Sequence, residues 1–223
     1  MATQRSEPEY ERTLLELLPP QGRWDDDAYL WLTERTARLL ELADGRIEVL
    51  PMPTDEHQDM LQTLFLALLV YTQAHGGKAH FAPLRLRIRA GKFREPDLLL
   101  LRDATDPRRS NRFWSGADLV VEVVSPDGAE RDLTDKVSDH SGCELTDKVS
   151  DHSGCELTDK VFDYAEAGIP EYWIVDPASG TITMLQLAGD RYHTHGVFGR
   201  GMTATVATLP GFAVSVGTVL DAR

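Results

Sequence analysis

The sequence predicts an α/β fold with a central mixed β-sheet flanked by helices. Along the chain, signals for a β-hairpin come first, then a long helix, a meander of strands and a strand–helix–strand unit. Strands that alternate with helices in this order are typical of α/β domains. The apolar runs 98–101 and 119–124 are short and bounded by turn residues, as expected of buried strands.

The chain has 223 residues, of which 42% are hydrophobic, and this suits one globular domain. We place that domain at residues 25–223, after an N-terminal extension of residues 1–24. The extension has no apolar segment typical of a signal peptide. The apolar stretch Leu64–Val70 is too short to cross a bilayer. We therefore expect a cytoplasmic protein with no membrane partner.

The first elements are a short helix and a hairpin. Acidic residues open a helix at 25–34. Asp44-Gly45 lies between the alternating runs 38–42 and 46–50, and Asp-Gly in this setting is a strong hairpin signal.

The long helix is bounded by its caps. Thr54 is a suitable N-cap and Gly76 a suitable stop, so the helix should end near His75. Its predicted apolar stripe consists of Leu61, Leu64, Phe65, Leu68 and Leu69.

The formal net charge of -13 argues against a generally basic surface that binds nucleic acid through its phosphates. A local basic groove remains compatible with an acidic total. Residues 84–89 alternate apolar residues with arginine, so we expect a strand with one buried and one wet face. We interpret the arginines of this strand and of the next loop as solvated: Arg85, Arg87, Arg89, Arg108, Arg109 and Arg112.

The C-terminal part begins with a helix at 157–167 that ends at Gly168. A strand at 171–177 and a hairpin of 181–187 with 192–198 should follow, which gives a C-terminal β-meander. The tail, 210–220, is predicted to be a short edge element.

Two acidic residues are associated with buried strands. Asp97 stands at the mouth of the first strand and Glu122 lies inside the second. A carboxylate in such a place is costly unless something pairs with it, and a divalent cation would do so. The alternative is structural, with Asp97 capping a turn and Glu122 pairing with an arginine such as Arg87. We favour the metal pair, with the Val123 carbonyl as a further ligand.

A lysine would complete such a site by orienting the attacking water. Lys160 follows Glu122 on the next predicted helix, while Lys136 and Lys148 are rivals at equivalent places in a repeat. His57 and Glu41 are candidate supporting residues. His57 is either near the site or on the surface, and Glu41 is more simply a surface or cross-strand residue.

The repeat consists of residues 133–144, an identical copy at 145–156 and a diverged copy from Leu157. We infer a tandem duplication, with 133–156 as an insertion at the rim of the site. Among the three copies, the third carries Phe162 and Tyr164, which are bulky enough to anchor a helix. We expect the first two copies to form a poorly packed surface excursion.

Several motifs together resemble the Uma-two family of endonucleases. The motifs are Leu40-Glu41-Leu42-Ala43-Asp44-Gly45, Glu56-His57-Gln58, Glu95-Pro96-Asp97, Val121-Glu122-Val123-Val124-Ser125-Pro126 and the stretch from Lys160 to Pro177.

The resemblance implies a restriction-endonuclease-like core of the PD-(D/E)XK type that hydrolyses DNA phosphodiesters with Mg²⁺, or with Mn²⁺ in its place. Asp97 then matches the first acid, Glu122 the second and Lys160 the lysine. Val124 stands where such nucleases usually carry the lysine.

Three functions remain open from the sequence. The first is a Mg²⁺-dependent endonuclease that acts on DNA, and the second is a catalytically inactive binding or regulatory module that keeps the fold. The third is a hydrolase of small phosphorylated compounds. Apolar edges in the C-terminal strands suggest a homodimer.

Overall fold

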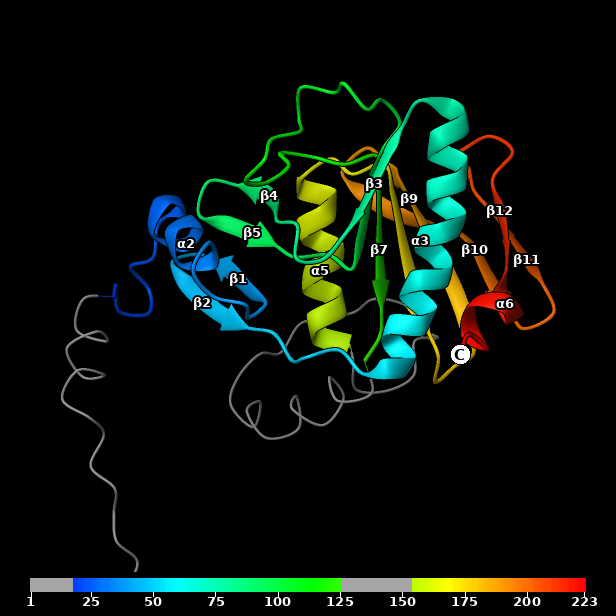
Figure 1. The fold of residues 1–223 in the computed structure, drawn as a ribbon, viewed down its shortest axis with the longest axis horizontal. Coiled ribbons are helices and arrows are strands. Elements are labelled where there is room, and N and C mark those ends of the chain that lie inside the picture. The colour runs from blue at the N-terminus through cyan, green and yellow to red at the C-terminus, as the bar shows by residue number, and fades with distance from the viewer. Residues whose placement is uncertain (1–17, 126–153) are drawn as a thin grey trace, which may run out of the picture.

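The computed structural model describes residues 18–125 and 154–223. Its α/β architecture is shown in Figure 1. The described helices are α2 (Asp26–Thr33), α3 (Asp55–His75), α5 (Gly154–Glu166) and α6 (Val216–Leu220). None of the helices described is long and apolar enough to span a membrane.

The central sheet has six strands in the order β10-β9-β8-β7-β6-β3. β7 and β8 are parallel, whereas the other neighbours are antiparallel, so the sheet is mixed as predicted. Its strands are β3 (Lys78–Phe81), β6 (Leu98–Leu101), β7 (Leu119–Val123), β8 (Glu171–Asp176), β9 (Thr181–Ala188) and β10 (Arg191–Gly199).

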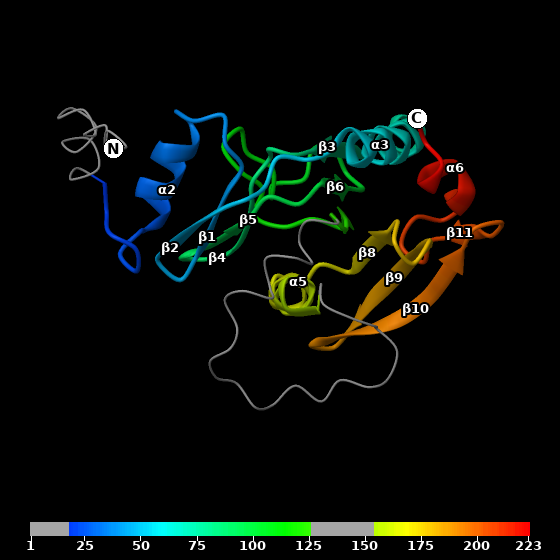
Figure 2. The same cartoon turned by 90° about the horizontal axis from the view of Figure 1, so that it is seen from below.

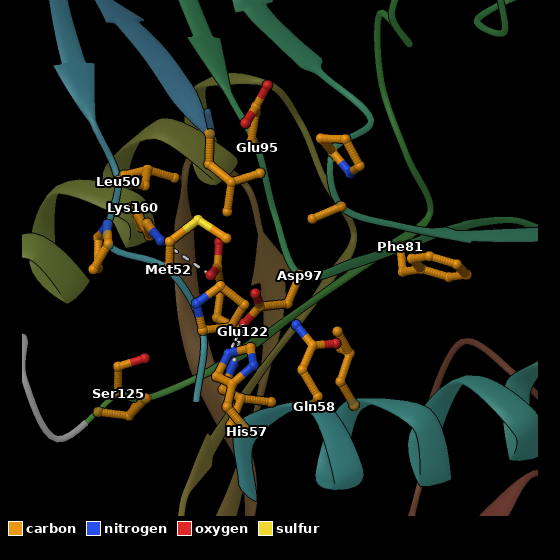
Figure 3. A pocket seen from close by; sticks show the side chains of 18 of the residues that line it. Leu50, Met52, His57, Gln58, Phe81, Glu95, Asp97, Glu122, Ser125 and Lys160 are labelled. Carbon is orange, nitrogen blue, oxygen red and sulfur yellow. Dashed lines mark hydrogen bonds and ion pairs between the residues drawn. The ribbon is translucent and has the colours of Figure 1, made fainter. Parts of the chain in front are cut away.

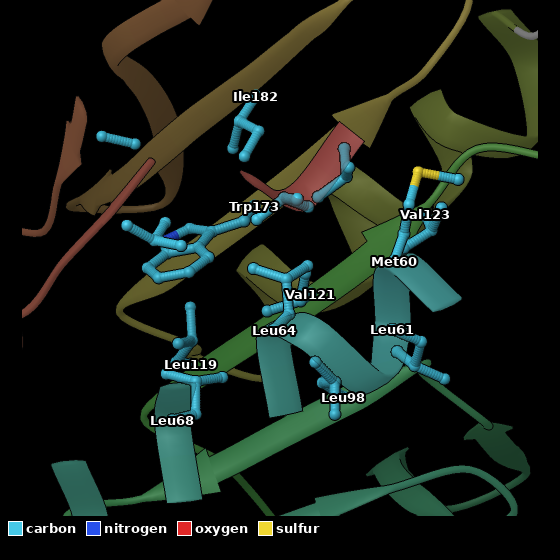
Figure 4. Close-up of a cluster of buried hydrophobic side chains, with 14 of the residues drawn as sticks. Met60, Leu61, Leu64, Leu68, Leu98, Leu119, Val121, Val123, Trp173 and Ile182 are labelled. Atoms are coloured by element: carbon cyan, nitrogen blue, oxygen red, sulfur yellow. The ribbon is translucent and has the colours of Figure 1, made fainter. Parts of the chain in front are cut away.

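Helices cover both faces of this sheet, with α3 on one side and α5 on the other (Figure 2). Successive residues of a strand point to opposite faces. Val121 therefore packs with Leu64 of α3, while Val120 packs with Tyr164 of α5. Figure 4 shows the buried hydrophobic cluster on the α3 side of the sheet, which includes Trp173.

The limits of α3 follow from its caps. The Thr54 hydroxyl accepts a hydrogen bond from the His57 backbone N–H at 3.2 Å. Gly76 ends the helix in the left-handed conformation, with φ of 82°, a region that costs glycine little. Both predicted ends are confirmed.

A second sheet has four strands in the order β2-β1-β5-β4. They are β1 (Leu40–Ala43), β2 (Arg46–Val49), β4 (Leu86–Arg89) and β5 (Lys92–Arg94). The β1–β2 hairpin is confirmed, with Asp44 and Gly45 both at positive φ. Trp24 is buried with α2 in the core of this sheet, and its backbone N–H donates to the Gly45 carbonyl at 3.0 Å. The last residues of the predicted extension therefore pack on the hairpin.

The prediction that Arg85, Arg87 and Arg89 are solvated is wrong for Arg85, whose side chain is only 14% exposed, whereas Arg87 and Arg89 keep 36% and 37% of theirs exposed. The guanidinium of Arg87 donates to Asp26 at 2.7 Å, and that of Arg85 donates to the Thr33 carbonyl at 2.8 Å. Both acceptors belong to α2, which covers this face of the strand. The alternating pattern of one β-strand does not show whether a helix from elsewhere in the chain covers its polar face.

The C-terminal tail is more than an edge element. β11 (Thr203–Thr205) pairs with β12 (Ala213–Ser215), and α6 follows at once. Val216, Val219 and Leu220 are buried in the same cluster as the apolar face of α3. Their helical spacing turns one apolar face onto α3.

Helix α5 begins at Gly154, three residues before the predicted start at Leu157, and ends before Gly168 at φ of 67°. Tyr164 is fully buried, but Phe162 is 57% exposed, so the expectation that Phe162 anchors the helix is wrong. Phe162 lies two residues from Tyr164 and so points to another side of the helix. The first repeat copy and most of the second lie outside the described residues.

Candidate active site

The first acid, Asp97, lies where the chain crosses from one sheet to the other. β5 belongs to the four-stranded sheet and β6 to the six-stranded sheet, and Glu95-Pro96-Asp97 connects them. The Asp97 Oδ2 atom accepts a hydrogen bond from the Val123 backbone N–H at 2.7 Å. This bond places Asp97 beside the end of β7. No hydrogen bond within the described residues uses its other oxygen, Oδ1.

The second acid, Glu122, is almost completely buried, with 6% exposure. Its Oε1 accepts from the Tyr164 hydroxyl at 2.5 Å, and its Oε2 accepts from Lys160 Nζ at 3.0 Å. Burial raises the pKa of Glu122, Lys160 opposes this rise, and the Asp97 charge adds to it. The alternative pairing with Arg87 is wrong, because Arg87 bonds to Asp26.

Lys160 and Tyr164 reach Glu122 from the same side of α5. They are four residues apart, a spacing that puts both side chains on one helix face. Lys160 is the predicted lysine, whereas Lys136 and Lys148 lie outside the described residues. The sequence did not single out Tyr164 as a site residue, although its spacing from Lys160 was a usable signal.

His57 lies at the site and not on the surface. Its Nε2 is 3.2 Å from Asp97 Oδ2, and the residue is only 5% exposed. Burial alone would lower the pKa of His57, but the hydrogen bond and charge of Asp97 outweigh it and raise the pKa. His57 therefore holds Asp97 from the α3 side, as Val123 does from β7.

Glu41 is not among the residues that line the cavity, and it is not at the surface, so the surface interpretation is wrong. The cross-strand interpretation is confirmed, because its partner Arg94 lies on β5, the strand next to β1. Glu41 is fully buried and accepts from Arg94 at 2.5 Å and from the Glu95 backbone N–H at 3.0 Å. Arg94 also donates to Asp163 of α5 at 2.7 Å, and Lys92 pairs with the same carboxylate. Glu41 thus belongs to a charge network that joins the second sheet to α5.

Glu95 is a buried acid that sequence reasoning did not single out. Burial raises its pKa to about 8, with a contribution from Glu41 that the Leu40 N–H and Arg85 oppose. Its Oε2 accepts from the Leu40 N–H at 3.1 Å. In Figure 3, its carboxyl group points away from those of Asp97 and Glu122.

A cavity of about 330 Å³ brings the site residues together (Figure 3). Asp97, Glu122, Val123, Val124, His57 and Lys160 all line it. In the described ranges, no group of three or more His, Cys, Asp or Glu residues has the arrangement of a metal site. Two carboxylates are nevertheless sufficient for Mg²⁺, which usually keeps several of its waters and takes one or two carboxylates from the protein.

The sequence matches one family along most of its length. Residues 26–147 and 148–217 match Uma2, described as "Putative restriction endonuclease". The chain belongs to this family. The predicted resemblance is therefore confirmed. The two matched segments meet inside the repeat, between Asp147 and Lys148.

One solved structure supports the fold of this Uma2 protein. It is described as a putative nuclease belonging to DUF820 from Anabaena variabilis ATCC 29413. The two chains share 18% identity over 87% of this chain and 96% of the other, with a TM-score of 0.63. No curated protein matches the chain.

Proposed function

We propose that this Uma2 protein is a Mg²⁺-dependent endonuclease that hydrolyses DNA phosphodiester bonds. The observation that carries the proposal is the convergence of Asp97, Glu122 and Lys160 on one cavity. Asp97 comes from the crossing before β6, Glu122 from β7 and Lys160 from α5. Family membership supports a nuclease, and the choice of DNA follows the family description.

The acids suit a hard cation that prefers oxygen ligands. Glu122 and the Oδ1 atom of Asp97 would hold Mg²⁺, with the Val123 carbonyl as a third ligand, and Mn²⁺ could replace it. When bound, the metal would lower the pKa of a coordinated water and stabilise charge on the phosphate. A bound cation would give the buried Glu122 carboxyl a second positive partner besides Lys160, which would lower the cost of its burial.

Lys160 would orient the attacking water and stabilise negative charge on the phosphate. Its Nζ is already held at 3.0 Å from Glu122, which places an ammonium group beside the acid that would bind the metal. Val124, at the usual position of the lysine, contributes only an apolar wall to the cavity. The lysine on α5 would therefore take the place of the one on the strand.

The test is cleavage of plasmid and branched DNA with Mg²⁺, with Mn²⁺ and with a chelator. We expect Asp97→Ala and Glu122→Ala to reduce metal-dependent cleavage to background. Asp190→Ala is the matched control, because this acid is exposed in the turn between β9 and β10. Unchanged cleavage by both site variants would show that the site assignment is wrong.

Calorimetry distinguishes the endonuclease from an inactive module of the same fold. We expect Mg²⁺ and Mn²⁺ to bind wild type at neutral pH and to bind Asp97→Ala and Glu122→Ala much more weakly. If wild type binds neither metal and cleaves no DNA, the inactive binding or regulatory module is the better assignment.

A further inference from the structure

The walls of the cavity are apolar, in contrast to its acidic floor. One wall is the segment 50–53, between β2 and α3, and the other is the segment 81–83, which begins with the last residue of β3. Met52 is 73% exposed and Phe81 is 51% exposed. Figure 3 shows these two side chains on opposite sides of Asp97 and Glu122. Large apolar groups this exposed beside a polar site indicate a surface that contacts a ligand.

Phe81 is held in place, and half of it is still accessible. Its ring packs edge-on against Phe65 of α3, with 4.9 Å between the ring centroids. A ring supported on one side and open on the other can stack on a flat ligand at little cost in conformational entropy.

Both walls lie next to residues that contact Asp97, one of the two acids that would bind the metal. The N–H of Ala82, which follows Phe81, donates to the Asp97 carbonyl at 3.0 Å. The Met52 wall leads into the first turn of α3, where His57 contacts Asp97 at 3.2 Å. A nucleotide whose phosphate is at the acids would therefore have its base next to one of these walls.

The net charge of the protein also favours recognition of the bases over recognition of the phosphates. Proteins that grip duplex DNA do so mainly by neutralising its phosphates with lysine and arginine. This chain has a net charge of -13, and Lys160, the cation among the described lining residues, is bonded to Glu122. Stacking of bases on aromatic side chains is another source of affinity for single-stranded nucleic acid, and it acts on the faces of the bases and not on the phosphates.

We propose that Phe81, with Met52 opposite, stacks an unpaired nucleobase of the substrate, so that the enzyme acts on single-stranded or locally unpaired nucleic acid. In a duplex, the face of each base is covered by its neighbours and is freed only at the cost of unstacking. A cavity of about 330 Å³ lies at the small end of ligand sites and suits one nucleotide. This inference rests on the proposed nuclease function and defines its substrate class.

The test compares binding of a fluorescent single-stranded oligonucleotide with binding of the same sequence as a duplex, without added divalent metal. We expect the single strand to bind more tightly and with a shallow dependence on salt. Phe81→Ala should weaken single-strand binding about 5- to 150-fold, the range expected for stacking of one base. Phe81→Trp should retain binding.

Two further variants separate stacking from loss of packing. Phe81→Leu keeps an apolar side chain against Phe65 but has no ring, so it should bind nearly as weakly as Phe81→Ala. Trp31→Ala removes an aromatic residue of similar exposure, 49%, on α2 outside the cavity, and should bind like wild type. A 2-aminopurine base in the oligonucleotide should be quenched by wild type and by Phe81→Trp, but not by Phe81→Leu.

The outcomes separate this inference from the proposed function. Equal binding of duplex and single strand, or equal binding by Phe81→Ala and Trp31→Ala, would overturn the stacking proposal even if metal-dependent cleavage is observed. Ring-dependent binding without cleavage of any nucleic acid would instead support stacking and contradict the nuclease. Binding of a free mononucleotide as tightly as the oligonucleotide would overturn the polymeric substrate and favour a hydrolase of small phosphorylated compounds.

Discussion

At the scale of single residues, the site depends on side chains that hold the two acids as much as on the acids themselves. Tyr164 and Lys160 each take one oxygen of Glu122, while His57 and the Val123 N–H share one oxygen of Asp97. Groups that orient metal ligands in this way typically affect metal affinity or activity by about 10- to 100-fold.

Tyr164→Phe tests this positioning role. The change removes the hydroxyl that donates to Glu122 at 2.5 Å and keeps the buried ring, so we expect metal affinity and cleavage to fall about 10- to 100-fold. Tyr192→Phe is the matched control, because its hydroxyl donates to the Ile169 carbonyl at 2.6 Å, outside the cavity lining. Isothermal titration with Mn²⁺ and a cleavage assay measure both variants, and equal effects would contradict the role of Tyr164.

Glu95 should make stability depend on pH. Its pKa is about 8 in the folded protein, so the folded state holds a proton that the unfolded state releases near the ordinary value of about 4.3. The stability from the neutral carboxyl is complete below the unfolded pKa and is lost as the pH rises to the folded value.

The free energy of unfolding of wild type should therefore fall between about pH 5 and about pH 9. We expect that of Glu95→Gln, which stays neutral, to fall by a few kcal/mol less over the same range. Urea unfolding at several pH values measures this difference. Glu166→Gln is the control, because Glu166 is 48% exposed in its side chain and pairs only at the surface with Arg89. A parallel decline of wild type and Glu95→Gln would show that Glu95 is already ionised in the folded protein.

At the scale of elements, the decisive feature is how α5 is fixed above β7. Asp163 accepts from Arg94 at 2.7 Å and pairs with Lys92, and Arg94 also bonds to Glu41. These contacts join α5 to the four-stranded sheet. Since Lys160 and Tyr164 lie on the same helix, the network also determines where they meet Glu122.

Asp163→Asn should destabilise the protein by about 1–3 kcal/mol, because Arg94 and Lys92 lose their shared carboxylate while Arg94 keeps its bond to Glu41. Asp159→Asn, at an exposed position one turn earlier on α5, should change stability by less than about 0.5 kcal/mol. Urea unfolding with a fluorescence readout measures both. Similar effects from the two variants would mean that the network does not hold α5.

At the scale of the whole molecule, the candidate site lies at the junction of the two sheets and the first turn of α3. The segment between β2 and α3 supplies one cavity wall, β7 and the crossing before β6 supply the acids, and α5 supplies the lysine. β10 forms an outer edge of the central sheet, with Val197 54% exposed. Homodimer formation through this edge stays a prediction that sedimentation analysis can test.

Deletion of repeat copies should leave the site intact. Lys160 and Tyr164 bond to Glu122 of β7, and Asp163 bonds to Arg94 of β5, so these contacts tie α5 to both sheets. We expect the deletion of 133–144 to retain wild-type metal binding and cleavage, since the copy before α5 keeps its sequence.

Deletion of 133–156, which joins Asp132 to Leu157, extends this test to the start of α5. We expect it to cleave within about tenfold of wild type, because Lys160 and the network around Asp163 remain. Loss of activity in a deletion variant that melts like wild type would show that the repeat takes part in the function.

The elements that sequence predicted well are those whose signals are local. Asp44-Gly45 set the hairpin, Thr54 and Gly76 set the limits of α3, and the apolar runs set β6 and β7. In each case the decisive residues are a few positions apart, so the backbone preference of a turn or cap is enough. The sequence by itself also determined the family, and it singled out Asp97, Glu122 and Lys160, which line one cavity.

The tertiary structure decided which charged residues meet. Lys160 is 38 positions from Glu122, and Arg94 is 53 positions from Glu41, so neither contact leaves a local pattern. For the same reason the cover of α2 over the arginines and the burial of Glu41 and Glu95 could not be predicted. Burial depends on which elements pack together, and only the assembled fold places two acids, a lysine and an apolar wall around one cavity.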